Sequence, residues 1–377
     1  MLEVADIIRA AGPEVCARLA VLPSQKRALQ AILQCRTPAL GGQVYVCAQC
    51  GQLDYSYHSC GNRHCPKCHG QHTERWLERQ RARLLPCPHY LLTFTLPAQL
   101  RPLAYAHQKL LYGGLLQAAA ASLHKLCADP QWLGAQPGSL GVLHTWTRAM
   151  LYHPHVHFLV SAGGLSADGQ HWLSAKNPAF LVPVRALSVI FRAKIKEVLR
   201  AADLLRLVPA SVWEQNWVVH AQPAGTGQRV LDYLGRYVYR IAITNSRLES
   251  LHDGHVIFRY RDNRTQQIQR VCLTPAQFVQ RWLQHVLPRG LAKVRHYGLY
   301  SAAAAQRHAA ALALLHPAAA ATPAPEPQPL TAAAAVQPNS PRRCPHCGSD
   351  QVFWFGTLRL GHVFWQDRVL LPQKVPP

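Results

Sequence analysis

Residues 153–160, His-Pro-His-Val-His-Phe-Leu-Val, constrain the fold of this chain more than any other stretch. Histidine alternates with other residues before an apolar run, which is the pattern of a β-strand whose successive side chains point to opposite faces. His153, His155 and His157 are therefore expected on one face. Neutral imidazole is a common metal ligand, so this strand predicts half of a metal site. A histidine-rich edge strand with solvated rings is the alternative that the stretch alone leaves open.

The charge of the chain indicates a polyanionic partner. Its 377 residues, enough for two domains, include 40 Lys and Arg against 18 Asp and Glu, a formal net charge of +22. This surplus favours nucleic acid, well ahead of an anionic membrane. We see no secretory signal and no apolar run long enough to span a membrane, so we expect a cytoplasmic protein.

The cysteines predict a structural zinc site, because clustered cysteines in the cytoplasm hold metal more often than they form disulfides. Residues 47–69 contain two C-x-x-C knuckles, and two knuckles can complete a tetrahedron. The four expected ligands are Cys47, Cys50, Cys65 and Cys68. Cys60 and His64 are spare candidates, which leaves open a different choice of four or a second ion. A set of reduced buried cysteines is the remaining alternative.

A further C-x-x-C knuckle, Cys344 with Cys347, stands alone near the end of the chain. One knuckle cannot close a tetrahedral site. It is either half of a shared site or a relic, and we expect no metal there.

Composition and turn signals predict four segments. They are a helical and zinc-binding DNA-binding domain (1–85), a catalytic domain (86–301), an Ala/Pro-rich linker with a first stretch that could be helical (302–341), and a C-terminal tail (342–377). Periodicity and turn residues predict strands at 89–96, 140–150, 155–161, 217–220, 256–261 and 267–273. Helices are predicted at 73–85, 99–127, 183–205 and 228–243, and from Pro275 through Val286.

A third imidazole could join the histidine pair. His144 precedes His155 by eleven residues, and an antiparallel pairing with a connection near residues 150–154 would turn it toward the same ion. Three imidazoles with open positions are typical of a catalytic metal. A histidine that is simply buried or solvated is the alternative for His144.

Two tyrosines follow at helical spacing. Tyr233 and Tyr237 are four residues apart and would share one helix face, with Arg236 and Arg240 nearby. A tyrosine hydroxyl has a pKa of about 10 and becomes a useful nucleophile when a metal polarises the target phosphate. Attack on DNA would give a 5′-phosphotyrosine and a free 3′-hydroxyl. Ordinary packing is the alternative, and Tyr239 falls on another face.

The candidate DNA-binding arginines lie in the basic helix 73–85, for which a solvated face is the alternative, beside the tyrosines, or in the basic and aromatic segment 287–300. They are Arg75, Arg79, Arg236, Arg240 and Arg295.

Four ordered motifs together resemble the IS91 family of rolling-circle transposases, two-tyrosine enzymes of the HUH endonuclease superfamily. The motifs are SCGNRHCPKC, HTWTRAMLYHPHVHFLVSAGGL, YLGRYVYR and LPRGLAKVRHYG, and the resemblance covers residues from about 40 to 300. It implies an α+β fold, with a central antiparallel sheet flanked by helices and an N-terminal zinc-binding module. In the last motif Leu291 and Lys293 depart from the residues expected there.

The resemblance also implies site residues and a reaction. His155 and His157 would hold Mg²⁺ or Mn²⁺, more weakly joined by His144, and Tyr233 and Tyr237 would attack single-stranded DNA at transposon ends. Host replication proteins are possible partners. A plasmid replication initiator or relaxase is one alternative, a non-enzymatic zinc-dependent DNA-binding protein is another, and a hydrolase of small phosphoesters is a distant third.

Overall fold

The structure is a computed structural model that describes residues 1–19, 21–226, 229, 242–262, 264–315, 342–359 and 362–365. Within these ranges the side chains of residues 14, 16, 69–73, 75 and 362–365 are not described. The chain divides into two compact units, Met1–Gln25 with His69–Thr322, and Lys26–Cys68 with Pro323–Pro377. The second unit therefore joins the N-terminal cysteine region to the C-terminal segment, which the sequence predicted as separate domains.

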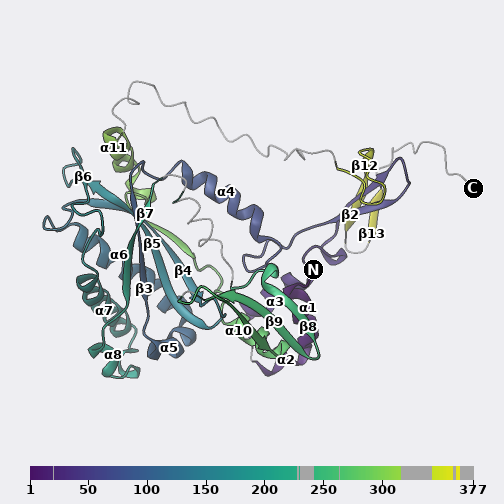
Figure 1. The fold of residues 1–377 in the computed structure, drawn as a ribbon, viewed down its shortest axis with the longest axis horizontal. Helices are drawn as coiled ribbons and strands as arrows, with labels where there is room; N and C mark the ends of the chain where they lie inside the picture. Colours follow the sequence, from purple (N-terminus) through teal and green to yellow (C-terminus); the bar gives the residue numbers. More distant parts are fainter. Residues whose placement is uncertain are drawn as a thin grey trace, which may run out of the picture. The chain divides into compact units, whose positions relative to one another are not determined.

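An antiparallel six-stranded sheet forms the centre of the first unit (Figure 1). Its strand order is β11-β4-β5-β3-β7, and β6 pairs with the far end of β5. The strands are β3 (His89–Thr95), β4 (Gln136–Trp146), β5 (Tyr152–Leu165), β6 (Trp172–Ser174), β7 (Val219–Gly225) and β11 (Val294–Gly298). The antiparallel sheet with flanking helices predicted from the sequence is confirmed, and the histidine-rich stretch lies on its central strand, β5.

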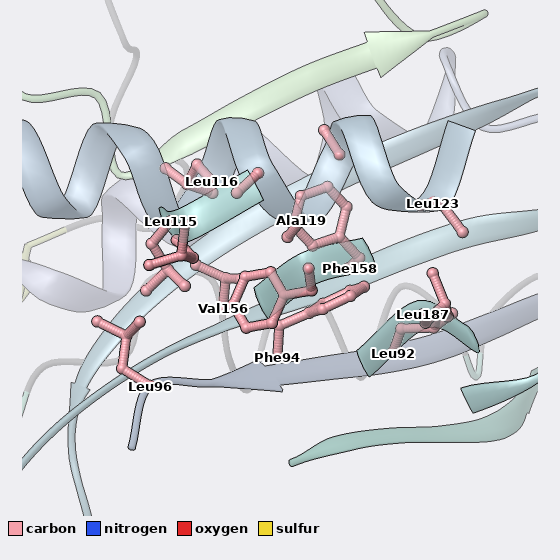
Figure 2. Packing of buried hydrophobic residues seen from close by; sticks show 14 of the residues in the cluster. Leu92, Phe94, Leu96, Leu115, Leu116, Ala119, Leu123, Val156, Phe158 and Leu187 are labelled. Carbon is pink, nitrogen blue, oxygen red and sulfur yellow. The ribbon is translucent and has the colours of Figure 1, made fainter. Parts of the chain in front are cut away.

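Three helices pack on one face of this sheet: α5 (Arg101–Ala106), α6 (Gln108–Cys127) and α7 (Val184–Ala201). The alternation of β5 turns Val156 and Phe158 toward α6, where both are fully buried. Figure 2 shows these side chains against Phe94 of β3 and Leu116 of α6. The long helix predicted over 99–127 is divided at His107, whose backbone leaves the helical region (φ −117°, ψ 46°).

The opposite face of the sheet is covered at one end. Leu140 and Leu159 pack there with Trp76 of α4 (His69–Arg81) and Ala311 of α11 (Ala305–Leu315). At the other end, the same alternation places the imidazoles of β5 on this face. The sheet thus has a mainly apolar helix-covered face, and an opposite face that changes from apolar to histidine-rich along β5.

A smaller sheet, order β10-β9-β8, belongs to the same unit. Its strands are β8 (Leu248–His252), β9 (His255–Arg261) and β10 (Ile268–Leu273), and it packs with α10 (Pro275–Leu283). The predicted hairpin and the predicted helix start are both confirmed, because Thr274 caps α10 by accepting a hydrogen bond from the Gln277 amide.

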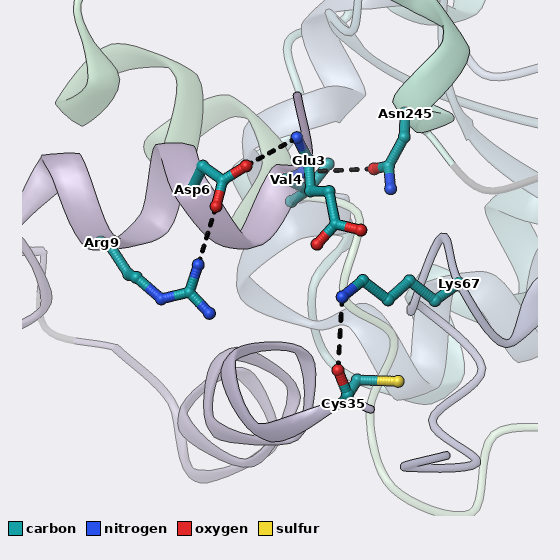
Figure 3. A network of polar contacts seen from close by, with 7 residues as sticks. All are labelled: Glu3, Val4, Asp6, Arg9, Cys35, Lys67 and Asn245. Carbon is teal, nitrogen blue, oxygen red and sulfur yellow. Dashed lines mark hydrogen bonds and ion pairs between the residues drawn. The ribbon is translucent and has the colours of Figure 1, made fainter. Parts of the chain in front are cut away.

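The N-terminal helix α1 (Val4–Ala11) packs against α10. Figure 3 shows its first turn, where the Asp6 carboxylate accepts a hydrogen bond from the Glu3 amide at 3.0 Å, and the Val4 amide donates to Asn245 Oδ1 at 3.2 Å. The short helices α2 (Pro13–Arg18) and α8 (Ser211–Glu214), together with α3 (Pro23–Gln34), complete the described helices other than 3-10 turns. Within the described ranges, no helix combines the length and apolarity needed to cross a membrane.

The second unit contains a four-stranded antiparallel sheet, order β13-β12-β1-β2. The strands are β1 (Gly42–Cys47), β2 (Leu53–Tyr57), β12 (Val352–Arg359) and β13 (His362–Trp365). The residues predicted to be a C-terminal tail therefore supply half of this sheet. The prediction separated them because β1 and β12 are about 300 residues apart, and local periodicity carries no information on pairing at that distance.

Candidate functional site

Three histidines lie close together on the face of the central sheet opposite α6, at the end that α4 and α11 do not cover. His144 of β4 lies directly opposite His155 of β5 in the strand register, and His157 follows two residues later on the same face. One ring nitrogen of each lies within 4.8 Å of those of the other two. The sequence placed His144 here through antiparallel pairing, and the structure brings it to the other two imidazoles.

Two hydrogen bonds orient the β5 imidazoles. His155 Nδ1 lies 2.7 Å from the His153 carbonyl oxygen, and His157 Nδ1 lies 3.0 Å from Thr93 Oγ1 of β3. A carbonyl can only accept, so Nδ1 of His155 carries the hydrogen and the lone pair is on Nε2. Engaging Nδ1 fixes the direction of both rings and, for His155, the tautomer, as in protein metal sites generally. A metal would therefore bind these rings through Nε2.

Burial keeps these rings neutral. It lowers the pKa of His155 to about 4 and that of His157 to about 3. At neutral pH both imidazoles therefore carry a lone pair, which is the state that binds metal. Stacking of His144 on Trp146, with ring centroids 4.9 Å apart, limits the motion of the third ring.

His153 has a different partner. Its Nδ1 lies 2.7 Å from Nη2 of Arg101, so it accepts a hydrogen bond from the guanidinium. It flanks the three-histidine group without belonging to it.

The three histidines line a pocket of about 530 Å³. Arg148 and Arg247 form part of its wall, with Asp262 as an acidic neighbour. Arg247 is held in place by donating to the carbonyl oxygens of Arg148 and Arg259. Lys293 lies 5.0 Å from the centre of the Trp146 ring and adds positive charge beside the pocket. The site therefore places neutral imidazoles beside a wall that contains two arginines and one aspartate.

Sequence reasoning missed the two pocket arginines. Arg148 lies in the connection between β4 and β5, only seven residues before His155, so the predicted hairpin itself was the signal that could have found it. No local sequence signal identifies Arg247, because it comes to the pocket from a segment far along the chain, directly before β8.

The other predicted site residues are not all brought to this pocket. Arg79 is exposed on α4 and lines a separate groove with Arg83 and His308. Arg295 pairs with Gly141 on the helix-covered face, where its Nη2 approaches Gly113 of α6. The side chain of Arg75 and the residues Tyr233, Arg236, Tyr237 and Arg240 lie outside the described part of the chain.

The cysteines form two separate groups rather than the single predicted one. Each has four thiols whose sulfur atoms lie within 4.8 Å of one another. The groups are Cys35, Cys60, Cys65 and Cys68, and Cys47, Cys50, Cys344 and Cys347. The prediction that Cys47 and Cys50 share an ion with Cys65 and Cys68 is therefore wrong, and so is the view of Cys344 and Cys347 as a lone knuckle.

The β1–β2 hairpin explains the error. Cys47 ends β1 beside the turn, whereas Cys60 follows Tyr57, which pairs with Gly42 at the other end of the hairpin. Five residues of strand separate the two ends by about 17 Å at ~3.4 Å per residue. One ion with bonds of about 2.3 Å cannot bridge that distance.

The first group has the spacing of a tetrahedral zinc site. Cys68 Sγ lies 3.5 Å from Cys35 Sγ and 3.6 Å from Cys60 Sγ. Zn–S bonds of about 2.3 Å require sulfur–sulfur distances of about 3.8 Å, so a slight widening of these contacts suffices. The Cys65 thiol lowers the pKa of Cys60 below its usual value by hydrogen bonding, which favours the thiolate. His64, a spare candidate in the sequence, is outside the group.

Cys35 was not predicted as a ligand because it stands alone, 25 residues before Cys60. It is held next to the knuckle by Lys67, whose Nζ donates to the Cys35 carbonyl oxygen at 3.3 Å (Figure 3).

Two family models match the chain. Residues 7–96 match a transposase zinc-binding domain, the one named for IS91, and residues 138–308 match a family described as putative transposase. The first cysteine group lies wholly within the former, and these two findings together support a structural zinc. The three histidines lie within the latter.

Two curated proteins resemble the chain over most of their length. A putative transposase y4qJ from Sinorhizobium fredii is 41% identical over 317 residues, covering 78% of this chain and 79% of the relative. The transposase for insertion sequence element IS801 from Pseudomonas savastanoi pv. phaseolicola is 31% identical over 290 residues, covering 71% and 68%. No solved structure matches significantly.

Proposed function

Because this chain belongs to the IS91-type transposases, DNA-processing enzymes of insertion sequences, we propose that it nicks single-stranded DNA at transposon ends for rolling-circle transposition. A tyrosine would attack the phosphodiester and remain joined to the DNA as a 5′-phosphotyrosine. The observation that carries this proposal is the group of three imidazoles, oriented by hydrogen bonds, in a pocket with arginines in its wall.

The donor set fits a catalytic divalent ion. His144, His155 and His157 would hold it, and three protein ligands leave positions open, as catalytic sites require. Nitrogen ligands favour Mn²⁺ over Mg²⁺, because Mg²⁺ prefers an all-oxygen shell. Such an ion, when bound, polarises a phosphoryl oxygen and stabilises developing negative charge.

The arginines of the pocket supply the contacts to the DNA backbone. Arg148 and Arg247 line the pocket beside the imidazoles, and both are anchored by backbone carbonyl oxygens. A guanidinium held in this way can hydrogen-bond a phosphate at little further entropic cost. These residues would place the scissile phosphate next to the histidines.

The nucleophiles of this proposal are Tyr233 and Tyr237. Both residues lie in the segment between β7, which pairs with the Thr93-bearing strand β3, and Arg247, which lines the pocket. The flanks of the tyrosine segment thus reach the histidine-bearing sheet and its pocket. Two tyrosines would permit a second strand transfer before the first link is resolved.

The test is covalent capture of DNA. The full chain is incubated with labelled single-stranded oligonucleotides from the transposon ends and Mn²⁺, and the products are separated on a denaturing gel. We expect a protein–DNA adduct that is lost on chelation, in Tyr233→Phe/Tyr237→Phe and in His155→Ala/His157→Ala. Tyr239→Phe is the matched control, because it removes a phenol from the same segment at a position predicted to lie on another helix face.

An adduct that persists in the double tyrosine variant would refute the tyrosine assignment. DNA binding with no cleavage under any divalent ion would instead favour a non-enzymatic zinc-dependent DNA-binding protein. Cleavage of a plasmid origin in preference to the transposon ends would favour a replication initiator or relaxase.

A further inference from the structure

The second cysteine group joins two parts of the chain that neither of the two matched family models spans. Cys47 and Cys50 lie within the matched zinc-binding domain, whereas Cys344 and Cys347 lie beyond both matched ranges. We propose that these four cysteines bind a second zinc ion, which fastens the C-terminal strands to the N-terminal hairpin. This inference does not depend on the proposed function.

The distances between the thiols fit a tetrahedral ion. Cys47 Sγ lies 3.6 Å from Cys347 Sγ, and Cys50 Sγ lies 3.6 Å from Cys344 Sγ. These contacts join one knuckle to the other, and a tetrahedral ZnS₄ centre requires about 3.8 Å along each edge. Four thiolates without carboxylate or open position are typical of a closed structural zinc site.

The two knuckles have the same backbone turn. In each, the amide of the glycine after the second cysteine donates to the carbonyl oxygen of the first cysteine at 2.9 Å. The amide of the first cysteine donates to the residue five positions later, at 3.1 Å in one knuckle and 2.7 Å in the other. Both glycines, Gly51 (φ +70°) and Gly348 (φ +77°), adopt the left-handed conformation that favours glycine. Such agreement between segments about 300 residues apart indicates a shared structural requirement, which a common ion supplies.

The strands leading to the knuckles hold them in register. β12 pairs with β1 from Gly42 opposite Leu358 to Cys47 opposite Val352, and the Ala48 amide continues the ladder to the Gln351 carbonyl oxygen. The cysteines therefore lie at the end of an antiparallel pairing that shifts register once, between Val44 and Tyr45.

Arg342 adds a contact on the other side of the C-terminal knuckle. Its Nε donates to Asp54 of β2 at 3.0 Å, and its guanidinium lies 4.0 Å from the centre of the Tyr45 ring of β1. These contacts already hold Cys344 and Cys347 near Cys47 and Cys50. Binding of the ion therefore does not have to close a long chain loop by itself, which lowers the entropic cost of forming the site.

The first experiment measures metal content. We expect two zinc ions per full-length chain by elemental mass spectrometry, and one in Cys344→Ser/Cys347→Ser, in which the retained ion shows that the first group is intact. Cys272→Ser is the matched control, since this exposed thiol of β10 lies in neither group, and it should retain two. Two zinc ions in the double variant, or iron in place of zinc at the second group, would overturn the proposal.

Cobalt titration tests the same point without a variant. The metal-depleted full chain should develop the absorption of a tetrahedral tetrathiolate complex until two equivalents of Co²⁺ have been added, and saturation at one would refute the second site. A protease site introduced within residues 316–341 then tests the fastening. After cleavage the C-terminal fragment should co-elute with the remainder when zinc is bound and separate in the double variant. Equal retention in both would show that the ion does not hold the segment.

Discussion

The Thr93 hydroxyl controls one of the three imidazoles, so replacing it tests the metal site without touching a ligand. Thr93→Val keeps the β-branched shape on β3 and removes only the contact from Oγ1 to His157 Nδ1, 3.0 Å in length. The ring then loses the hydrogen-bond partner that fixes its direction. Such second contacts are generally worth about 10- to 100-fold in metal affinity.

The structure gives a similar magnitude by a second route. His157 is half-buried, and leaving a polar nitrogen there without its partner costs up to about 1–3 kcal/mol. At ~1.4 kcal/mol per factor of ten, this cost corresponds to roughly 5- to 150-fold. We therefore expect the Kd for Mn²⁺ to rise about 10- to 100-fold, measured by calorimetric titration of protein with its zinc sites filled.

Thr95→Val is the matched control. Thr95 lies on the same strand opposite His155 and also lines the pocket, but its hydroxyl has no hydrogen-bond partner among the described residues. Its replacement should change the Kd less than twofold. The reasoning fails if Thr93→Val binds Mn²⁺ as tightly as the unchanged protein, or if both valine variants weaken binding equally.

Three further outcomes concern stability. Phe158→Ala removes a fully buried ring between the sheet and α6. It should lower the free energy of unfolding, measured in urea, by about 3–5 kcal/mol. A decrease below ~1 kcal/mol would contradict this packing. Gly298→Ala should lower the melting temperature far more than Gly290→Ala, although both glycines have positive φ. The new Cβ would meet the Pro137 carbonyl oxygen at position 298 and open space at position 290. Equal decreases in melting temperature would refute this. Burial lowers the pKa of His89 to about 4, so between pH 6.5 and 4 the unfolded state takes up a proton that the folded state does not. The free energy of unfolding therefore decreases as the pH is lowered through this range. His89→Gln should therefore reduce the stability lost between pH 7 and 5 by about 2 kcal/mol in urea titrations, and an unchanged loss would contradict a neutral buried ring.

Much of the central sheet could be predicted because its signals are local. Alternation located the strands around His89 and His155, and the short connection between β4 and β5 forced an antiparallel pairing that brought His144 opposite His155. Once two strands are known to pair antiparallel, the face of each side chain follows from its position. This is why three site residues from two strands could be chosen before the fold was known.

The remaining errors have a common physical cause. The assignment of Cys47 and Cys65 to one ion assumed that neighbours in sequence are neighbours in space, but a rigid hairpin holds them apart while β12 brings Cys344 to Cys47. Arg295 was a candidate DNA contact on charge alone, yet its register opposite Gly141 turns it to the helix-covered face. Long-range register is decided by the whole sheet, and no window of sequence contains it.

The pairing of β1 with β12 also affects the order in which the protein can form on the ribosome. β1 emerges early, but its partner is made only after Val352, about 300 residues later. At a synthesis rate of ~5–20 residues per second, one edge of β1 and the thiols of Cys47 and Cys50 stay unpaired for tens of seconds until their partners are made. A transcript cut short before this point would yield a chain that contains the complete histidine-bearing sheet and a permanently open strand edge, the kind of surface that promotes aggregation. A truncated transposase of this kind would therefore lack the completed sheet of the second unit.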